Sequence, residues 1–183
     1  MARLKPVSSD PAQLSAAQRR VYDAIASGPR KQVRGPFPYL LNSPEACDCI
    51  QRLGGYLRYS APVSGRFGEL IVLVTARYWD CHYEWSIHVE LARKEGVPEN
   101  VIAEIKAGKR PSSDADAALI HDVAHALYDD YAIPQPLYDE AVARLGEPAL
   151  LDMVVMIGYY AMLAQVFAAF EVMPAAGAET LKG

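Results

Sequence analysis

An uncharged run of 18 residues, positions 153–170, is the feature that most constrains how this chain can fold. The run is formally long enough to cross a membrane as a helix. However, Asp152 and Glu171 flank it, and Tyr159 and Tyr160 lie in its middle rather than at its ends, where membrane helices carry aromatic residues. A helix that is apolar on every side is otherwise typical of a protein core or a subunit interface. We therefore expect a buried helix and no membrane partner.

The same run predicts a homo-oligomer. A protomer of 183 residues has few surfaces left with which to cover a helix that is apolar all round. We expect one stripe of this helix, for example Tyr159, Met162 and Val166, to lie at a contact between subunits.

The rest of the chain predicts further helices. Ser15 followed by Gln18 is a capping-box sequence, and Ser43-Pro44, Ser64 and Asp114 each mark a helix start. No stretch alternates apolar and polar residues between hairpin turns, so we expect no strands. The fold class predicted from this pattern is all-α, with seven or eight helices.

We predict one all-α domain over residues 1–183, with a flexible tail at 1–14. Residues 64–110 form a helical unit that carries the candidate site, and residues 113–172 form a second, degenerate unit. The two units share an apolar segment that ends in aromatic residues, LIVLVTARY at 70–78 and DMVVMIGYY at 152–160. Residues 29–45 read as a long irregular connection between helices.

The composition excludes several classes of partner. The net charge is −4 and basic residues do not cluster, so we expect no nucleic acid and no polybasic membrane surface. The three cysteines Cys47, Cys49 and Cys81 are an odd number, which favours a reducing cytoplasm over a disulfide framework. The chain opens without an apolar secretory segment, and we expect a cytoplasmic protein.

The candidate active site lies in residues 68–96. On a helix with 100° per residue, Cys81, Glu84 and His88 lie at about 0°, −60° and −20°, within one narrow wedge. Glu84 and His88 are four residues apart and can form a hydrogen bond. Glu69 adds a second carboxylate from the preceding helix. The wedge is flanked by aromatic residues including Trp85, which favours a pocket over a solvated face.

These residue types suit proton transfer. His88 can donate or accept a proton near neutral pH, and Glu84 can orient it or serve as an acid. Cys81 lies beside His88, which would favour its thiolate, yet a dithiol relay needs a second cysteine. We interpret Cys81 as a residue that lines the site.

The spacing of Glu69, Cys81, Glu84 and His88 resembles the carboxymuconolactone decarboxylase and alkylhydroperoxidase D superfamily. The flanking segments YEWSIH, LARKEGVPENVIAEIKAG and GPFPYLLNSPE are similar to its decarboxylase-like branch, and the resemblance covers roughly residues 21–172. The peroxidase branch carries Glu, Cys-x-x-Cys and His, and Glu84 stands here in place of the second cysteine. The resemblance implies an all-α helical bundle that associates into trimers or hexamers.

The resemblance also implies an enzyme without a cofactor. We expect a carbon-carbon lyase that decarboxylates, or shuttles a proton on, a small anionic organic acid or lactone. From the sequence itself, Arg30, Arg34 and Arg77 are candidate carboxylate anchors and Trp85 is a further candidate substrate-binding residue, although the segment of Arg30 and Arg34 reads more readily as a solvated basic loop. The alternatives are an antioxidant peroxidase that acts through Cys81 and a non-enzymatic oligomer of the same fold.

We expect no metal site. His82 is rotated by about 100° from Cys81 on a helix and points away from the candidate site. His121 and His125 form a pair four residues apart, and we interpret them as partly buried histidines rather than metal ligands.

Overall fold

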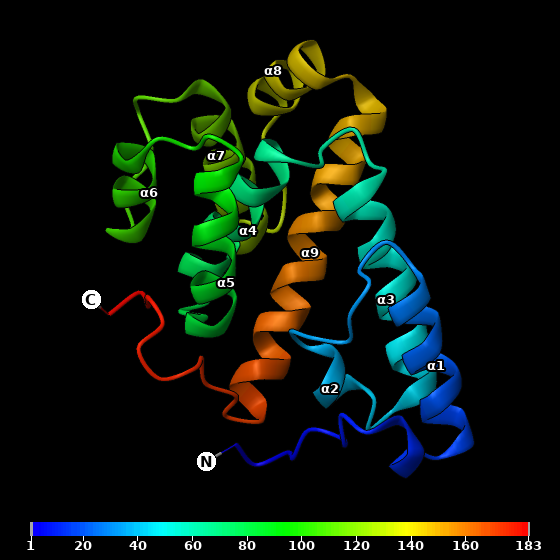
Figure 1. Ribbon diagram of the computed structural model, residues 1–183. Coiled ribbons are helices and arrows are strands. Elements are labelled where there is room, and N and C mark those ends of the chain that lie inside the picture. Colours follow the sequence, from blue (N-terminus) through cyan, green and yellow to red (C-terminus); the bar gives the residue numbers. More distant parts are fainter. Residues whose placement is uncertain (1, 183) are drawn as a thin grey trace.

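The computed structural model describes residues 2–182, and within that range the protein is all-helical with no strand, as predicted (Figure 1). The helices are α1 (Ala16–Ser27), α2 (Phe37–Leu40), α3 (Pro44–Tyr59), α4 (Arg66–Tyr78), α5 (His82–Lys94), α6 (Glu99–Lys106), α7 (Ala115–Asp129), α8 (Gln135–Leu145) and α9 (Glu147–Ala169), and a 3-10 turn η1 (Pro11–Gln13) precedes them. The helix not predicted is the short α2, which lies inside the stretch that the sequence indicates as irregular.

The centre of the fold is α4, which packs against α5, α9 and α7. Every residue of α4 from Gly68 to Ala76 is buried, so this helix is enclosed on all sides over two turns. In Figure 1, α9 runs through the middle of the molecule, with α1 and α3 on one side of it and α5, α6 and α7 on the other. The segments 70–78 and 152–160, which resemble each other in sequence, therefore lie on two helices that contact each other.

The uncharged run lies in α9, whose length and composition alone would suit a membrane span. More than half of its most apolar window, 56%, is buried inside the protein, as in the core helix of a globular domain. The predicted stripe is wrong at Tyr159, whose exposed fraction is 5% because its ring lies inside the protomer against α3. The exposed apolar stripe of α9 instead begins with Leu151 (64%) and Val155 (36%) and continues through the half-buried Met162.

A glycine allows the close contact between α3 and α9. A Cβ atom on Gly54 would lie 2.2 Å from the hydroxyl oxygen of Tyr159, well inside van der Waals contact. That hydroxyl donates a hydrogen bond to the backbone carbonyl of Ile50 at 3.2 Å. The contact thus requires both the absence of a side chain at position 54 and a carbonyl one turn earlier in α3.

Of the four predicted helix starts, two have side-chain caps; Ser43 is the N-cap of α3 without a side-chain hydrogen bond, and Ser64 is not an N-cap. Ser15 and Gln18 form the capping box at α1, and the Asp114 side chain accepts from the Ala117 amide at α7. The prediction for Ser64 is wrong, because α4 begins after Gly65 (φ 65°) without a side-chain cap. A positive φ is open to glycine at little cost, so the chain enters α4 by a backbone turn.

Candidate active site

His88 lies between two carboxylates in the interior of the protein. Its Nδ1 is 2.6 Å from Glu69 Oε2, and its Nε2 is 3.2 Å from Glu84 Oε2. Glu84 and His88 are on successive turns of α5, whereas Glu69 comes from the first turn of α4. All three side chains are buried, and the predicted cluster of two carboxylates and one imidazole is therefore present.

Two further side chains complete the cluster, and the sequence reading missed both. Arg58, in the last turn of α3, donates from Nη2 to Glu69 Oε1 at 3.2 Å and from Nη1 to the hydroxyl of Tyr160 at 3.0 Å. The same Nη1 lies 3.3 and 3.4 Å from the two ring nitrogens of His88. Because these distances are nearly equal, Nη1 does not point at the lone pair of either nitrogen. Glu69 therefore bridges two cationic groups, one through each oxygen. The cluster draws on α3, α4, α5 and α9.

The neighbours of His88 set its charge. Burial opposes a positive imidazole, but the charge of Glu69 and the hydrogen bonds to Glu69 and Glu84 outweigh burial and raise the pKa of His88. Burial likewise opposes the charge of Glu69, while His88 and Arg58 together lower the pKa of that carboxyl. The two neighbours thus favour each other's charged forms, and the charged form of His88 is the one that can donate a proton.

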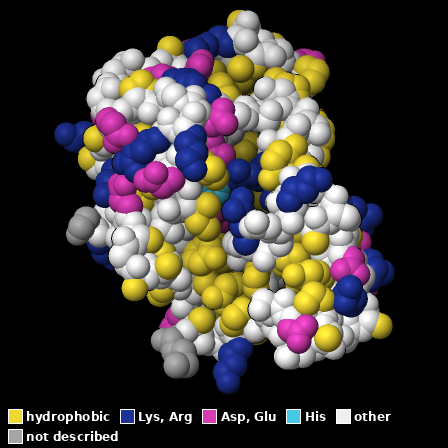
Figure 2. All heavy atoms as spheres, in the orientation of Figure 1, with side chains coloured by type: hydrophobic (Ala, Val, Ile, Leu, Met, Phe, Trp, Pro, Cys, Tyr) yellow, Lys and Arg dark blue, Asp and Glu magenta, His cyan; other side chains and the backbone are white. Residues whose placement is uncertain are grey.

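A cavity of about 320 Å³ opens onto this cluster from the surface. Its wall includes Glu84 and His88 of the cluster. Cationic side chains in the wall outnumber the carboxylates: Arg30, Arg34, Arg58 and Lys94 against Glu84 and Glu90. Figure 2 shows Lys and Arg side chains around a hollow on this face, with a histidine visible inside it. The cavity therefore suits a small anionic ligand.

Two of the cavity residues have unused hydrogen-bonding atoms. Arg30 lies with its Cζ atom 4.6 Å from the ring centre of Phe37, and its buried Nε has no partner within residues 2–182. The buried Glu84 Oε1 also lacks a partner in that range. A donor and an acceptor without partners beside a cavity are available to a ligand.

Cys81 does not share the face of Glu84 and His88. It is the N-cap of α5, with ψ at 87°, so the helical rotation of 100° per residue does not extend to it. Its side chain lines another pocket, together with His82 and Phe167. Burial raises the pKa of the Cys81 thiol to about 12. Cys81 was predicted to line the site but does not line the cavity at His88, and a thiol with so high a pKa is a poor nucleophile.

Arg77 and Trp85 also lie away from the cavity. Arg77, predicted as a carboxylate anchor, lines a third pocket between α4 and α7. Trp85 is fully buried in the core and does not line the cavity. Neither residue lines the cavity at His88. His82 points elsewhere, as expected, and its Nδ1 accepts from the backbone amide of Leu181.

Residues 44–127 match the model of the carboxymuconolactone decarboxylase family. Arg58, Glu69, Glu84 and His88 all lie in the matched segment, whereas Tyr160 lies beyond it. No curated protein matches the chain.

Two solved structures are similar to this fold. An uncharacterized peroxidase-related protein from Silicibacter sp. TM1040 superposes with a TM-score of 0.73 at 15% identity, covering 96% of this chain and 96% of that one. A protein of unknown function from Agrobacterium tumefaciens, described as a putative antioxidant defence protein AhpD, superposes with a TM-score of 0.66 at 20% identity, covering 78% of this chain and 99% of that one. At these identities the likeness establishes the helical fold alone.

Proposed function

We propose that this chain, whose residues 44–127 match the carboxymuconolactone decarboxylase family, is a cofactor-free lyase that decarboxylates a small organic acid or lactone carrying more than one anionic group. One observation carries the proposal: the charged His88, fixed between Glu69 and Glu84, borders a cavity walled by arginines. Such a site can hold an anion and deliver a proton to it.

The reaction divides among the residues of the cavity. Arg30 and Arg34 hold the carboxylate of the substrate that is retained. The bond to the departing carboxylate breaks, carbon dioxide leaves, and the electron pair remains as an enolate. Arg58 stabilises the enolate oxygen, since its guanidinium lies beside His88 at the inner end of the cavity. His88 then gives a proton to carbon, and Glu69 keeps the imidazole oriented.

Glu84 has a second part in this scheme. One of its oxygens is bound to His88 Nε2, and the other, Oε1, has no partner within residues 2–182. The free oxygen can accept a hydrogen bond from a hydroxyl of the substrate. This places the substrate within reach of the imidazole and favours hydroxylated acids and hydrated lactones over plain fatty acids.

Peroxidase activity through Cys81 is the second candidate, because the two structural neighbours carry peroxide-related descriptions. The thiol chemistry speaks against it. The pKa of Cys81 is raised to about 12, and all three cysteines are free, with Cys47 in a separate apolar cluster around Val21 and Phe37. A catalytic disulfide cycle needs an acidic thiol and a second thiol beside it.

The test measures two activities on one preparation. Release of carbon dioxide is followed for a panel of carboxylated lactones and β-keto acids, and consumption of hydrogen peroxide is followed with and without a dithiol. We expect decarboxylation of at least one member of the panel, unaffected by Cys81→Ser, and no dithiol-dependent peroxide turnover. Peroxide turnover that is lost in Cys81→Ser would overturn the proposal.

We further propose that the protein is a homo-oligomer, with the exposed stripe of α9 at the contact. Leu151 and Val155 leave apolar surface open on a helix whose most apolar window is 56% buried within the protomer. Leu151→Lys should dissociate the assembly, which light scattering at micromolar concentration detects. A wild-type monomer under the same conditions would contradict the proposal.

A further inference from the structure

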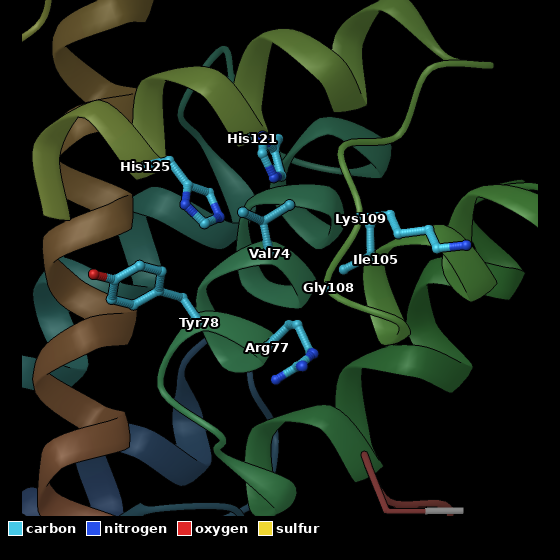
Figure 3. A pocket seen from close by; sticks show the side chains of 8 residues that line it. All are labelled: Val74, Arg77, Tyr78, Ile105, Gly108, Lys109, His121 and His125. Atoms are coloured by element: carbon cyan, nitrogen blue, oxygen red, sulfur yellow. The ribbon is translucent and has the colours of Figure 1, made fainter. Parts of the chain in front are cut away.

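The pocket that Arg77 lines, of about 210 Å³, lies between α4, the end of α6 and α7, and the lyase proposal does not use it (Figure 3). The histidines of α7 point into it from one side, and α4 forms the facing wall. Its lining combines apolar and nitrogen-bearing side chains and contains no carboxylate: Val74, Arg77, Tyr78, Ile105, Gly108, Lys109, His121 and His125.

Arg77 supplies the strongest donor in this pocket. Its Nε atom is buried and has no hydrogen-bond partner within residues 2–182. The guanidinium lies against Gly108, where an added Cβ would approach Nη2 to 3.0 Å. Gly108 has a φ of 70°, so a larger residue at this position would be strained as well as crowded. The backbone thus leaves room for a cationic side chain whose donors are not all used.

The two histidines are held with one nitrogen each toward the pocket side. Their rings stack with centroids 4.1 Å apart. His121 Nδ1 lies 3.2 Å from Asp122, and His125 Nδ1 lies 3.1 Å from Asp129. A carboxylate at Nδ1 fixes the proton on that nitrogen, which leaves Nε2 of each ring as the atom free to bind a ligand.

The charges around the pocket decide between a metal ion and an anion. Paired imidazoles with carboxylates at Nδ1 are also found around metals. Here, however, Arg77 and Lys109 line the same pocket, and no group of three or more potential metal ligands exists within residues 2–182. Two neighbouring cations disfavour a divalent cation and favour an anion.

We propose that this pocket is a second binding site, for a small oxyanion attached to an apolar body. The oxyanion, a phosphate or a carboxylate, is bound by Arg77 and by Nε2 of protonated His121 and His125. The apolar body lies against Val74 and Ile105. The site is separate from the cavity at His88, since the two linings have no residue in common.

The pH dependence follows from the same groups. Burial lowers the pKa of His121, and His125 and Arg110 add to the effect while Asp122 opposes it. The other charged or titratable groups facing it are Arg77 and Tyr78 on α4, Lys109 after α6, and Asp129 on α7. A bound anion offsets the cations and raises the pKa of His121, so binding takes up a proton and strengthens as pH falls.

The experiment titrates the full-length protein with inorganic phosphate and, separately, with benzoate, and follows the histidine imidazoles by NMR. We expect saturable shifts at His121 and His125 and binding that tightens by about threefold or more from pH 7.5 to pH 6. Tighter binding of phosphate identifies a phosphate group as the ligand, and tighter binding of benzoate identifies a carboxylate. Shifts confined to His88, or no saturation with either anion, would overturn the proposal.

Matched variants localise the effect. Arg77→Met should weaken binding about tenfold or more, the usual loss for a charged hydrogen bond, whereas Arg52→Met on α3 should leave it unchanged. His121→Gln is a second variant, since its side chain is half-buried and its loss leaves the core intact; it should weaken binding and reduce the pH dependence. Binding by Arg77→Met or His121→Gln that equals the wild type would exclude this pocket as the site.

Discussion

The protein contains two imidazole clusters in which a histidine contacts a carboxylate, and the two have opposite electrostatics. Two carboxylates enclose His88, and its pKa is raised despite complete burial. His121 is only half-buried and has one carboxylate neighbour, yet its pKa is lowered. Burial lowers the pKa of both imidazoles; the carboxylates outweigh burial at His88, whereas His125 and Arg110 add to it at His121. A histidine–carboxylate pair therefore does not by itself define an acid–base site.

The difference assigns distinct chemistry to the two clusters. If the cavity wall were anionic, it would favour the charged imidazole further, and His88 would release its proton less readily. In the cavity that His88 faces, the cations predominate. The lowered pKa of His121 favours its neutral form, and a bound anion would favour the charged form. The first cluster is suited to donating a proton and the second to binding an anion. The following predictions test this contrast.

The largest effect is expected on catalysis. His88→Gln should lower carbon dioxide release on the best substrate by roughly 10²–10⁴-fold, the usual contribution of a positioned acid. His82→Gln is the matched control on the same helix, because His82 lies at another pocket. Steady-state rates of the two variants make the measurement. A folded His88→Gln protein with full activity would remove His88 from the mechanism.

Stability should separate the clusters next. Glu69→Gln leaves His88 and Arg58 without their shared anion, and we expect a loss of about 3–5 kcal/mol in the free energy of unfolding. Asp122→Asn removes a carboxylate from a partly exposed pair with Arg110, and its cost should stay below about 1 kcal/mol. Urea denaturation of both variants measures the difference. Equal losses would mean that the Glu69 bridge is no stronger than a surface pair.

Substrate binding should depend on the arginines at the first cavity only. Arg34→Met should raise KM by about tenfold with little change in kcat, as expected for a contact that holds the substrate equally in the ground and transition states. Arg52→Met, an exposed arginine outside the cavity, is the control. A fall in kcat at constant KM would instead assign Arg34 to the chemical step.

The smallest expected effect is on the pH dependence of stability, which should have opposite signs for His88 and His121. The raised pKa of His88 gives stability that is complete below its ordinary value of about 6.5 and is lost as pH rises through the raised value. The lowered pKa of His121 gives stability that is present above about 6.5 and is lost as pH falls. Melting temperatures measured from pH 5 to 9 should show the largest loss of stability in His88→Gln, relative to the wild type, below pH 6.5. His121→Gln should converge on the wild type in the same range, and parallel curves would contradict both assignments.

The sequence was a good guide to what is local along the chain. Helix caps such as Ser15 and Asp114 and the pair Glu84–His88 depend on spacings of three or four residues, which a helix converts directly into contacts. Glu69 was also identified, because its helix precedes the site helix directly. The superfamily resemblance was confirmed and the all-α class with it.

The sequence could not supply contacts between distant elements. Arg58 and Tyr160 are 102 residues apart and meet only because α3 and α9 pack together. Two tyrosine hydroxyls in an uncharged run were the available signal for Tyr160, since a buried hydroxyl requires a partner. The predicted position of Cys81 differs from the structure for another reason. The rotation of 100° per residue applies inside a helix, and Cys81 lies at the helix boundary, as the N-cap of α5.

The close contact of Gly54 with Tyr159 has a consequence for how this sequence can change over evolution. Any side chain at position 54 collides with the tyrosine ring, and a smaller residue at 159 leaves a void and removes the hydrogen bond to the carbonyl of Ile50. Neither position can drift alone, although 105 residues separate them. In an alignment of relatives the two columns should therefore change together, and a glycine with a tyrosine at these columns would mark the descendants that keep this helix spacing.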